Sequence, residues 1–426
     1  MTALQARRID VCPAGARPSP PATARGLKIL HFLPLLRLDQ GGPVRAVIDL
    51  AEAMAARGHE VDVASCDHAD CPEAWRGAHP GSGAPRLVPY RSGSLPGPLF
   101  TRRELSRFSR QLERYDVVHF HNIWRPAILQ LAPAAERAGA SYIVSARGML
   151  DEWPMAQKRL KKRLYLAAGG SRVLTRAGWV HCTAEAERRQ AARWIGDGRT
   201  AVIPNFMSLR RYVDPPGPEP ARRALDLPDD GVPLVLFLSR VVHNKGPDIL
   251  IRAASILAGR GVSFRVIVAG DGDPQYVADM KALAAGLGLG DRVRFVGMVG
   301  GEVKHALLSA ATVMALPTCQ ENFGFVFFEA LACGTPVLTS NLVDTAAELE
   351  AGGGTLLTDL ADEAFAERLG DLLADRGRAR MMGAVGRRWV FKYLSPGTLL
   401  PRFESLYRTA GERRFRNPEP TAACAW

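Results

Sequence analysis

The chain has 426 residues, enough for two domains of ordinary size. Hydrophobic residues make up 47% of it and charged residues 23%, which is ordinary for a soluble globular protein. No apolar run approaches the ~20 residues that a membrane-spanning helix needs, so no such helix is expected. The formal net charge of +12 suggests an anionic partner, which could be a phosphate group, a membrane surface or a nucleic acid.

The N-terminus is predicted to be a leader without structure. Residues 1–25 are mostly polar, with many prolines and alanines, and no apolar core follows Arg7 and Arg8, so no signal peptide is expected. Seven cysteines are scattered along the chain. Only Cys66 and Cys71 are close in sequence, and no second pair completes a zinc site. We therefore expect reduced thiols in a cytoplasmic protein.

Residues 26–208 are predicted to form an α/β domain with parallel strands. Strands are expected at 28–33, 61–64, 117–120, 142–145, 179–183 and 202–205, helices at 44–56, at 105–115 and from 185 onward, and a long loop at 67–100. Gly41 and Gly42 stand at the first strand-to-helix turn, where a phosphate or an acceptor could approach the backbone. They form no dinucleotide motif, because the third glycine is missing.

Three further features of this domain could contribute to a site. His121 ends the strand at 117–120, where open α/β sheets place ligand groups, although a single histidine there is more often structural. Arg147 follows the next strand and could bind an acceptor or donor phosphate. Residues 158–166 alternate lysine and arginine with leucine. Such a basic amphipathic segment either rests on anionic lipid or forms a solvated face.

Residues 209–232, rich in proline, are predicted to link the first domain to a second one at 233–395. In that domain strands are expected at 234–238, 264–269, 293–296, 311–316 and from 337, and helices at 249–257, 325–333 and 361–376. Arg240 and Lys245 flank the loop after the first of these strands. Two cations there suit a diphosphate, the alternative being two solvated loop charges.

The stretch 317–336 is the most informative part of the sequence. Its predicted helix is apolar on every side except for Glu329, a charge that must be hydrogen-bonded if it is buried. Gly334 stands where a left-handed cap would end the helix. Glu321 precedes the helix, and Gly324 frees the backbone beside it, so the helix N-terminus could meet an oxygen-rich ligand. The alternative is a glutamate paired with an arginine, and a turn without a ligand.

This stretch resembles the Glu-x7-Glu signature of the retaining glycosyltransferases of family 4, which have the GT-B fold. The resemblance implies two Rossmann-like doubly wound domains that face each other across a cleft. It extends from Lys28 onward, weakly in the first domain and strongly from Arg240 to Pro336. The Arg-Gly-Met-Leu string that begins at Arg147, with the basic helix after it, resembles members that build bacterial surface polysaccharides. In the GT-B fold the C-terminal segment, here 396–412, packs back on the first domain.

The resemblance also implies roles for individual residues. Catalytic roles would fall to His121, Arg240, Lys245 and Glu321. The donor would be bound by Arg240, Lys245, Glu321, Asn322, Phe323, Gly324 and Glu329, with Met298 in the turn that meets the base. Gly41, Gly42 and Arg147 would lie on the acceptor side of the cleft. Many relatives have a glycine pair where this chain has residues 341–344, which leaves the contact of that loop to the diphosphate open.

These roles imply sugar transfer from a nucleotide-diphosphate sugar to a glycan or lipid-linked glycan acceptor, at the inner face of the cytoplasmic membrane. No cofactor or metal is expected, because Arg240, Lys245 and helix dipoles would carry the phosphate charge. Two alternatives remain: a nucleotide-sugar epimerase of the same fold, and a non-catalytic anion-binding protein. Nucleic acid is not an expected partner, because aromatic residues are only 7% of the chain and lie mostly in apolar runs.

Overall fold

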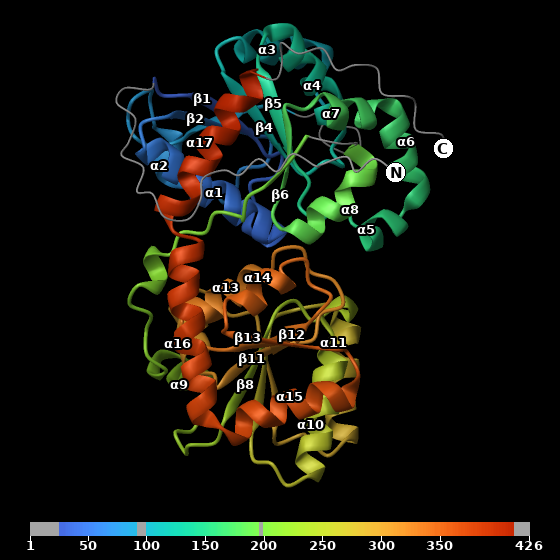
Figure 1. Cartoon of the computed structure of the whole chain (residues 1–426), viewed down its shortest axis with the longest axis vertical. Helices are drawn as coiled ribbons and strands as arrows, with labels where there is room; N and C mark the ends of the chain where they lie inside the picture. The colour runs from blue at the N-terminus through green and yellow to red at the C-terminus, as the bar shows by residue number, and fades with distance from the viewer. Residues whose placement is uncertain (1–24, 92–98, 196–198, 413–426) are drawn as a thin grey trace, which may run out of the picture.

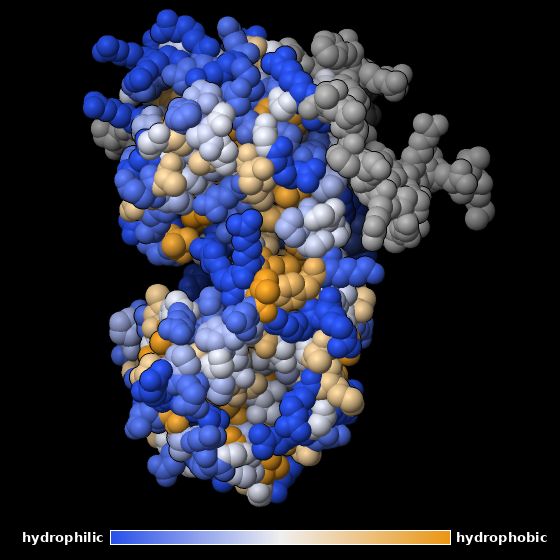
Figure 2. All heavy atoms as spheres, turned by 90° about the vertical axis from the view of Figure 1, so that its left-hand side faces the viewer, coloured by the Kyte–Doolittle hydropathy of each residue, from blue (hydrophilic) through white to orange (hydrophobic). Residues whose placement is uncertain are grey.

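The computed structural model describes residues 25–91, 99–195 and 199–412, which form two lobes, each built around a parallel sheet (Figure 1). The predicted fold class, two doubly wound parallel-sheet domains, is confirmed. The predicted leader lies outside the described residues, except for residue 25. Figure 2 shows a notch between the two lobes.

The first sheet has seven strands in the order β3-β2-β1-β4-β5-β6-β7. Their bounds are β1 (Lys28–Phe32), β2 (Glu60–Ser65), β3 (Arg86–Pro89), β4 (Val117–His121), β5 (Ser141–Ser145), β6 (Trp179–Cys182) and β7 (Thr200–Val202). Both faces of the sheet are buried, since Ile29 belongs to one core cluster and Leu30 to another. Continuous apolar runs, rather than alternating ones, are what a sheet covered on both faces requires.

Eight α-helices cover the described part of this domain. They are α1 (Gly42–Ala56), α2 (Glu73–Arg76), α3 (Arg102–Leu112), α4 (Pro126–Ala138), α5 (Glu152–Ala156), α6 (Arg159–Tyr165), α7 (Ser171–Arg176) and α8 (Glu185–Ile195). The prediction of a long loop at 67–100 was wrong, because α2 and the short edge strand β3 lie within this segment. The strand predicted at 202–205 ends at Val202 instead, before Pro204, which has no N–H to donate to a neighbouring strand.

The second sheet has six strands in the order β10-β9-β8-β11-β12-β13. They are β8 (Leu234–Leu238), β9 (Arg265–Ala269), β10 (Val293–Gly297), β11 (Val313–Leu316), β12 (Val337–Ser340) and β13 (Thr355–Thr358). Its helices are α10 (Pro247–Gly259), α11 (Pro274–Gly286), α12 (Gly301–Ala310), α13 (Phe325–Ala332), α14 (Ala346–Ala351) and α15 (Asp362–Ala374). The segment predicted as a linker contains a further helix, α9 (Glu219–Leu225).

Two helices at the C-terminal end connect the lobes. α16 (Arg376–Tyr393) runs along the second domain, and α17 (Pro396–Glu412) continues upward onto the first, as Figure 1 shows. Glu404 of α17 pairs with Arg57 at 2.6 Å and with His59 at 3.0 Å. Thr409 accepts a hydrogen bond from the indole of Trp179. Contacts from residues so distant in sequence tie the end of the chain to the first domain.

The strand order of each sheet reverses at one point. In the first sheet the chain leaves β1 to one side and returns beside it as β4; in the second, β8 and β11 have the same relation. In open parallel sheets, ligands bind in the crevice outside the carboxyl ends of the two strands at such a reversal. The topology therefore indicates one crevice in each domain.

Candidate active site

The crevice of the second sheet brings together two residues that the sequence suggested for catalysis. Lys245 follows β8 and Glu321 follows β11, and the Lys245 ammonium lies 2.6 Å from the Glu321 carboxylate. Lys245 is only 6% exposed and also donates to the carbonyl of Gln320. Arg240, after the same strand, is exposed and has no ion pair within the described residues. The crevice thus contains one paired and one unpaired cation.

The loop between β11 and α13 is closely packed against the helix that it precedes. Gly324 has a φ of +69°, and a Cβ atom there would lie 2.3 Å from the ring of Phe327, so only glycine fits. The side chain of Phe323 stacks on Phe328 with ring centroids 4.4 Å apart. Because Phe323 is buried in the core, only its backbone could contact a donor.

Glu329, on α13, is stabilised by a cation from the neighbouring helix. Its carboxylate lies 2.6 Å from the ammonium of Lys304 on α12, and its side chain is 14% exposed. The sequence suggested an arginine as a possible partner of this glutamate, and the structure shows a lysine in that role. Tyr212 also hydrogen-bonds Glu329, and burial together with this carboxylate raises the pKa of that tyrosine. Met298, predicted to lie near the base, is 75% exposed just after β10.

The glycine pair of the first domain lies where the two domains meet. Gly41 has a φ of +86°, in the region that favours glycine. A Cβ atom on Gly42 would lie 2.6 Å from the ring of Phe325, the first residue of α13. The N-terminus of α1 therefore approaches the N-terminus of α13 across the interface, and Gly42 makes that approach possible.

His121 and Arg147 lie together, but inside the first domain. His121 is fully buried, and its Nδ1 lies 3.2 Å from the Arg147 guanidinium. Because arginine can only donate, this Nδ1 accepts, so Nε2 carries the proton and donates to Nδ1 of His31 at 2.9 Å. Arg147 also donates to Asn205 at 2.6 Å. Both nitrogens of His121 are therefore used within the protein.

A second buried chain of hydrogen bonds runs beside the first. His181 Nε2 donates to the carbonyl of Ile203 at 2.7 Å, so its Nδ1 accepts from Ser145. Ser145 in turn accepts from Nε2 of His119, whose Nδ1 then accepts from the Tyr407 hydroxyl at 3.1 Å. Burial lowers the pKa of His181 to about 3, so the ring is neutral near pH 7. These hydrogen bonds connect α17 to β4, β5 and β6.

Ring nitrogens of His31, His119 and His121 lie within 4.8 Å of one another, and within the described ranges this is the single group of a size that could hold a metal. However, both nitrogens of His119 and of His121 already bind protein groups, and the Arg147 cation touches His121. A cation added there would meet that guanidinium in a buried environment. The group fits a hydrogen-bonded network better than a metal site.

Two buried carboxyl groups meet across the domain interface. Asp344, after β12, accepts from Asn322 at 2.9 Å and from Gln190 of α8 at 2.8 Å. It also hydrogen-bonds Asp151, which comes from the first domain. Burial and the neighbouring Asp344 raise the pKa of Asp151 to about 10, and burial raises the pKa of Asp344. Asp151 is therefore the protonated partner near pH 7.

Asn322 belongs to this same interface. Its Oδ1 accepts from Thr183 of the first domain at 3.1 Å, and its Nδ2 donates to Asp344. Its side chain thus spans the domains, and a donor would meet its backbone. Sequence reasoning missed Asp151 and Asp344. The available signal was the loop at 341–344, which departs from the family's glycine pair.

Comparison with known proteins agrees with this geometry. Residues 41–205 match the glycosyl transferase 4-like domain, and residues 220–389 match glycosyl transferases group 1. The chain is 31% identical to a D-inositol 3-phosphate glycosyltransferase of Salinispora tropica, over 94% of this chain and 89% of that protein. The chain belongs to the group 1 glycosyltransferases.

A further relative and a solved structure agree with this assignment. A GDP-mannose-dependent alpha-(1-6)-phosphatidylinositol monomannoside mannosyltransferase of Mycobacterium tuberculosis is 29% identical, over 74% of this chain and 83% of that protein. The crystal structure of Anabaena Alr3699/HepE in complex with UDP has a TM-score of 0.73 at 20% identity, covering 90% of this chain and 100% of that one. This glycosyltransferase is thus an enzyme, and not the anion-binding protein kept as an alternative. Among its described helices, none has the length and apolar character needed to cross a bilayer.

Proposed function

We propose that this glycosyltransferase takes a sugar from a nucleotide-diphosphate sugar and transfers it, with retention of configuration, to a lipid-linked glycan in cell-surface polysaccharide synthesis. The observation that carries the donor half is the Lys245–Glu321 pair at the crevice of the second sheet. Lys245 and the unpaired Arg240 would neutralise the diphosphate as it leaves. The Lys304–Glu329 pair would leave the Glu329 carboxylate placed to accept from ribose hydroxyls.

The acceptor half of the proposal has separate support. The relatives described above are named for inositol phosphate and phosphatidylinositol mannoside acceptors, one without lipid and one with it. The resemblance of the string at Arg147 to surface-polysaccharide enzymes favours a lipid-linked glycan. The acceptor would enter from the first domain, beside Gly41 and Gly42.

The enzyme would then work at the cytoplasmic face of a membrane. Leu160 and Leu164 lie one turn apart on α6, and they are 72% and 61% exposed. Trp153 on α5 is 48% exposed. Apolar side chains exposed among lysines and arginines suit the surface of an anionic bilayer. There the leucine and tryptophan side chains would insert, and the lysines and arginines would pair with anionic head groups.

Calorimetric titration with UDP, GDP and ADP tests the donor site. We expect one nucleotide to bind, and Glu329→Ala to weaken that binding by about 10- to 100-fold, as the loss of a charge-assisted hydrogen bond implies. Glu363→Gln, a surface carboxylate of α15, is the control. If no nucleotide binds to the wild-type protein, the proposed donor chemistry is wrong.

The proposal also includes catalysis without a metal. Addition of EDTA to an assay of sugar transfer should leave the rate unchanged, since Arg240, Lys245 and the N-terminus of α13 would carry the phosphate charge. Loss of the rate in EDTA, restored by a divalent ion, would contradict this part of the proposal.

A further inference from the structure

A small cavity lies at the crevice of the first sheet. Its volume is about 160 Å³, and all of its lining residues belong to the first domain. Leu33 and Leu35, from the loop after β1, and Met149, after β5, supply an apolar wall. Asn122 and Arg125, from the segment between β4 and α4, supply polar groups. The cavity therefore occupies the point where the strand order reverses, beside the Gly41–Gly42 turn.

Asn122 shows two features of a residue that awaits a ligand. It is only 8% exposed, and its Oδ1 has no hydrogen-bond partner within the described residues. A buried acceptor without a partner costs stability, which a hydrogen bond from a ligand would recover. Its φ is +68°, in the left-handed region, which asparagine adopts more readily than most residues. A hydroxyl group in the cavity would satisfy the free Oδ1.

The other polar elements of the cavity favour an anion. The Arg125 side chain is half-buried and makes no ion pair with any described residue. Arg125 is the residue just before α4, whose first turn starts at Pro126. Pro43 and Val44, from the first turn of α1, line the cavity as well. Both helices therefore direct the positive ends of their dipoles toward this region.

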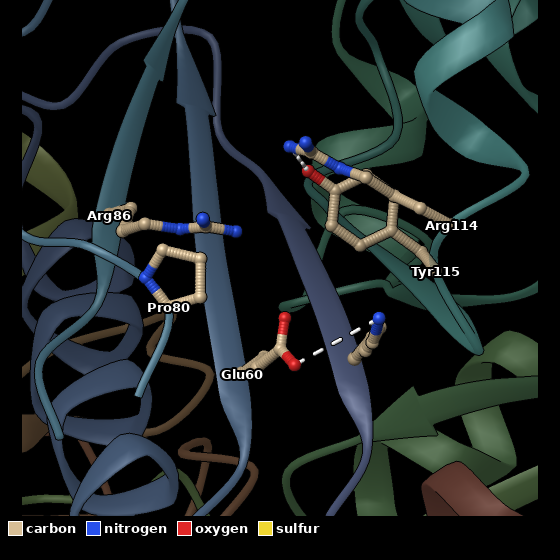
Figure 3. Close-up of a pocket in the computed structure, with 6 residues that line it drawn as sticks. Glu60, Pro80, Arg86, Arg114 and Tyr115 are labelled. Atoms are coloured by element: carbon tan, nitrogen blue, oxygen red, sulfur yellow. Dashed lines mark hydrogen bonds and ion pairs between the residues drawn. The ribbon is translucent and has the colours of Figure 1, made fainter. Parts of the chain in front are cut away.

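A second cavity, shown in Figure 3, provides a contrast. It lies at the amino ends of the strands, where Lys28 begins β1 and Arg86 begins β3. Its arginines, Arg86 and Arg114, both pair with the buried carboxylate of Asp62, at 2.7 and 2.8 Å. Each of these arginines has a carboxylate partner, whereas Arg125 has none within the described residues, so this cavity is the weaker candidate for an anion.

We propose that the cavity beside Asn122 and Arg125 is an acceptor subsite that takes a hydroxylated group bearing a phosphate. Arg125 and the two helix N-termini bind the phosphate, and Asn122 Oδ1 accepts the proton of a neighbouring hydroxyl. The C–H face of a sugar or polyol ring packs on Leu33, Leu35 and Met149. The phosphate belongs either to a soluble sugar phosphate or to a lipid head group. This inference rests on the proposed function, because it assigns the acceptor side of the same cleft.

The soluble source is tested by calorimetry with glucose 6-phosphate and, for comparison, glucose. We expect only the phosphorylated sugar to bind, and Arg125→Gln to weaken its binding at least 10-fold. Arg103→Gln removes an exposed arginine of α3 that has no ion pair with a described residue, and it is the matched control.

Asn122→Asp keeps the size of the side chain and tolerates the left-handed backbone. It places a negative charge in the cavity, so it should also weaken the binding of the phosphorylated sugar. This second variant covers the case in which Arg125→Gln disturbs the start of α4.

The lipid source is tested with phosphatidylcholine vesicles, with and without phosphatidylinositol. If the head group is the source, Arg125→Gln loses binding to the phosphatidylinositol vesicles and Arg103→Gln does not. Both variants keep α6 intact, so a difference between them reports on the cavity and not on that helix.

Equal binding by Arg125→Gln and Arg103→Gln, or no binding to either probe, would overturn the subsite. UDP, GDP and ADP are titrated into the same samples to keep the two proposals apart. A nucleotide that binds Arg125→Gln normally, when the phosphate probe does not, supports the subsite. A wild-type protein that binds the phosphate probe but no nucleotide contradicts the donor proposal alone.

Discussion

At the scale of single residues, the crevice of the second domain depends on paired charges. Lys245 and Glu321 come from different loops, and each keeps the other from being a half-buried charge without a partner. A ligand phosphate can compete for Lys245 because the ammonium can donate three hydrogen bonds, two of which the structure assigns to Gln320 and Glu321. The pair would therefore be able to bind the proposed donor and to respond to its charge.

We expect Lys245→Ala to lower the turnover number by about 10²- to 10³-fold, the range seen when one preorganised donor to a developing negative charge is removed. The fold should persist, because the side chain of Glu321, which loses its partner, is 24% exposed and can be solvated by water. The measurement is the rate of sugar transfer at saturating donor, with the thermal midpoint as a check of folding. Lys392→Ala, an exposed lysine of α16, is the control. Wild-type turnover of Lys245→Ala would remove this residue from the site.

At the scale of elements, α17 is fastened to the first domain by polar contacts as well as by apolar packing. The Tyr407 hydroxyl donates to His119, and that bond starts the chain through Ser145 and His181. Both histidine rings in this chain of hydrogen bonds are neutral, and each has one acceptor nitrogen, so the order of donors is fixed. Removal of the first donor leaves a buried acceptor without a partner.

Tyr407→Phe should therefore lower the free energy of unfolding by about 1–3 kcal/mol, the cost of an unsatisfied buried group. Tyr276→Phe is a matched control, because the Tyr276 hydroxyl is buried and has no partner within the described residues. Its removal should be neutral or stabilising. Urea denaturation of the two variants and the wild type makes the comparison. Equal effects of the two substitutions would show that the His119 bond adds nothing to stability.

The helix α6 is a second element with a separable role. We expect the double variant Leu160→Ser, Leu164→Ser to lose most of its binding to vesicles that contain anionic lipid, since burial of each leucine contributes about 1.5–3 kcal/mol. Met381 and Val385 of α16 are also exposed and one turn apart, at 67% and 39%. Their double serine variant is the control in a vesicle sedimentation assay. Unchanged binding by the α6 variant would return that helix to an ordinary solvated surface.

At the scale of the whole molecule, the sequence predicted most of the fold but less of the site. Most strands and α13 could be predicted from apolar runs that end at a glycine, because an element that is buried on all sides has a continuous apolar sequence. β3 is only four residues long and β13 follows three glycines, so neither gave such a pattern. Lys245 and Glu321, which the sequence suggested for one site, lie 2.6 Å apart at the crevice of the second sheet. The burial of His121 and the pairing of Asp151 with Asp344 depend on how the domains meet, which no local pattern records.

The interface between the domains should respond to pH through this last pair. Asp151 donates its proton to a hydrogen bond with Asp344, and burial raises its pKa to about 10. An unfolded aspartate has a pKa of about 3.9, so between these values the folded protein binds a proton that the unfolded chain has released. The free energy of unfolding must then fall as pH rises, by up to about 1.4 kcal/mol per pH unit, because a higher pH favours the unfolded chain, in which this aspartate is ionised. Below about pH 4 both states are protonated and this dependence ends.

Asp151→Asn should remove most of this dependence. The amide can still donate to Asp344, but it does not titrate. We therefore expect the thermal midpoint of the wild type to fall more steeply than that of Asp151→Asn between pH 6 and pH 9. Glu363→Gln removes one surface carboxylate and is the control, because it should leave this dependence on pH unchanged. Parallel curves for Asp151→Asn and the wild type would mean that another group holds the domains together, and that Asp151 is ionised in the folded enzyme.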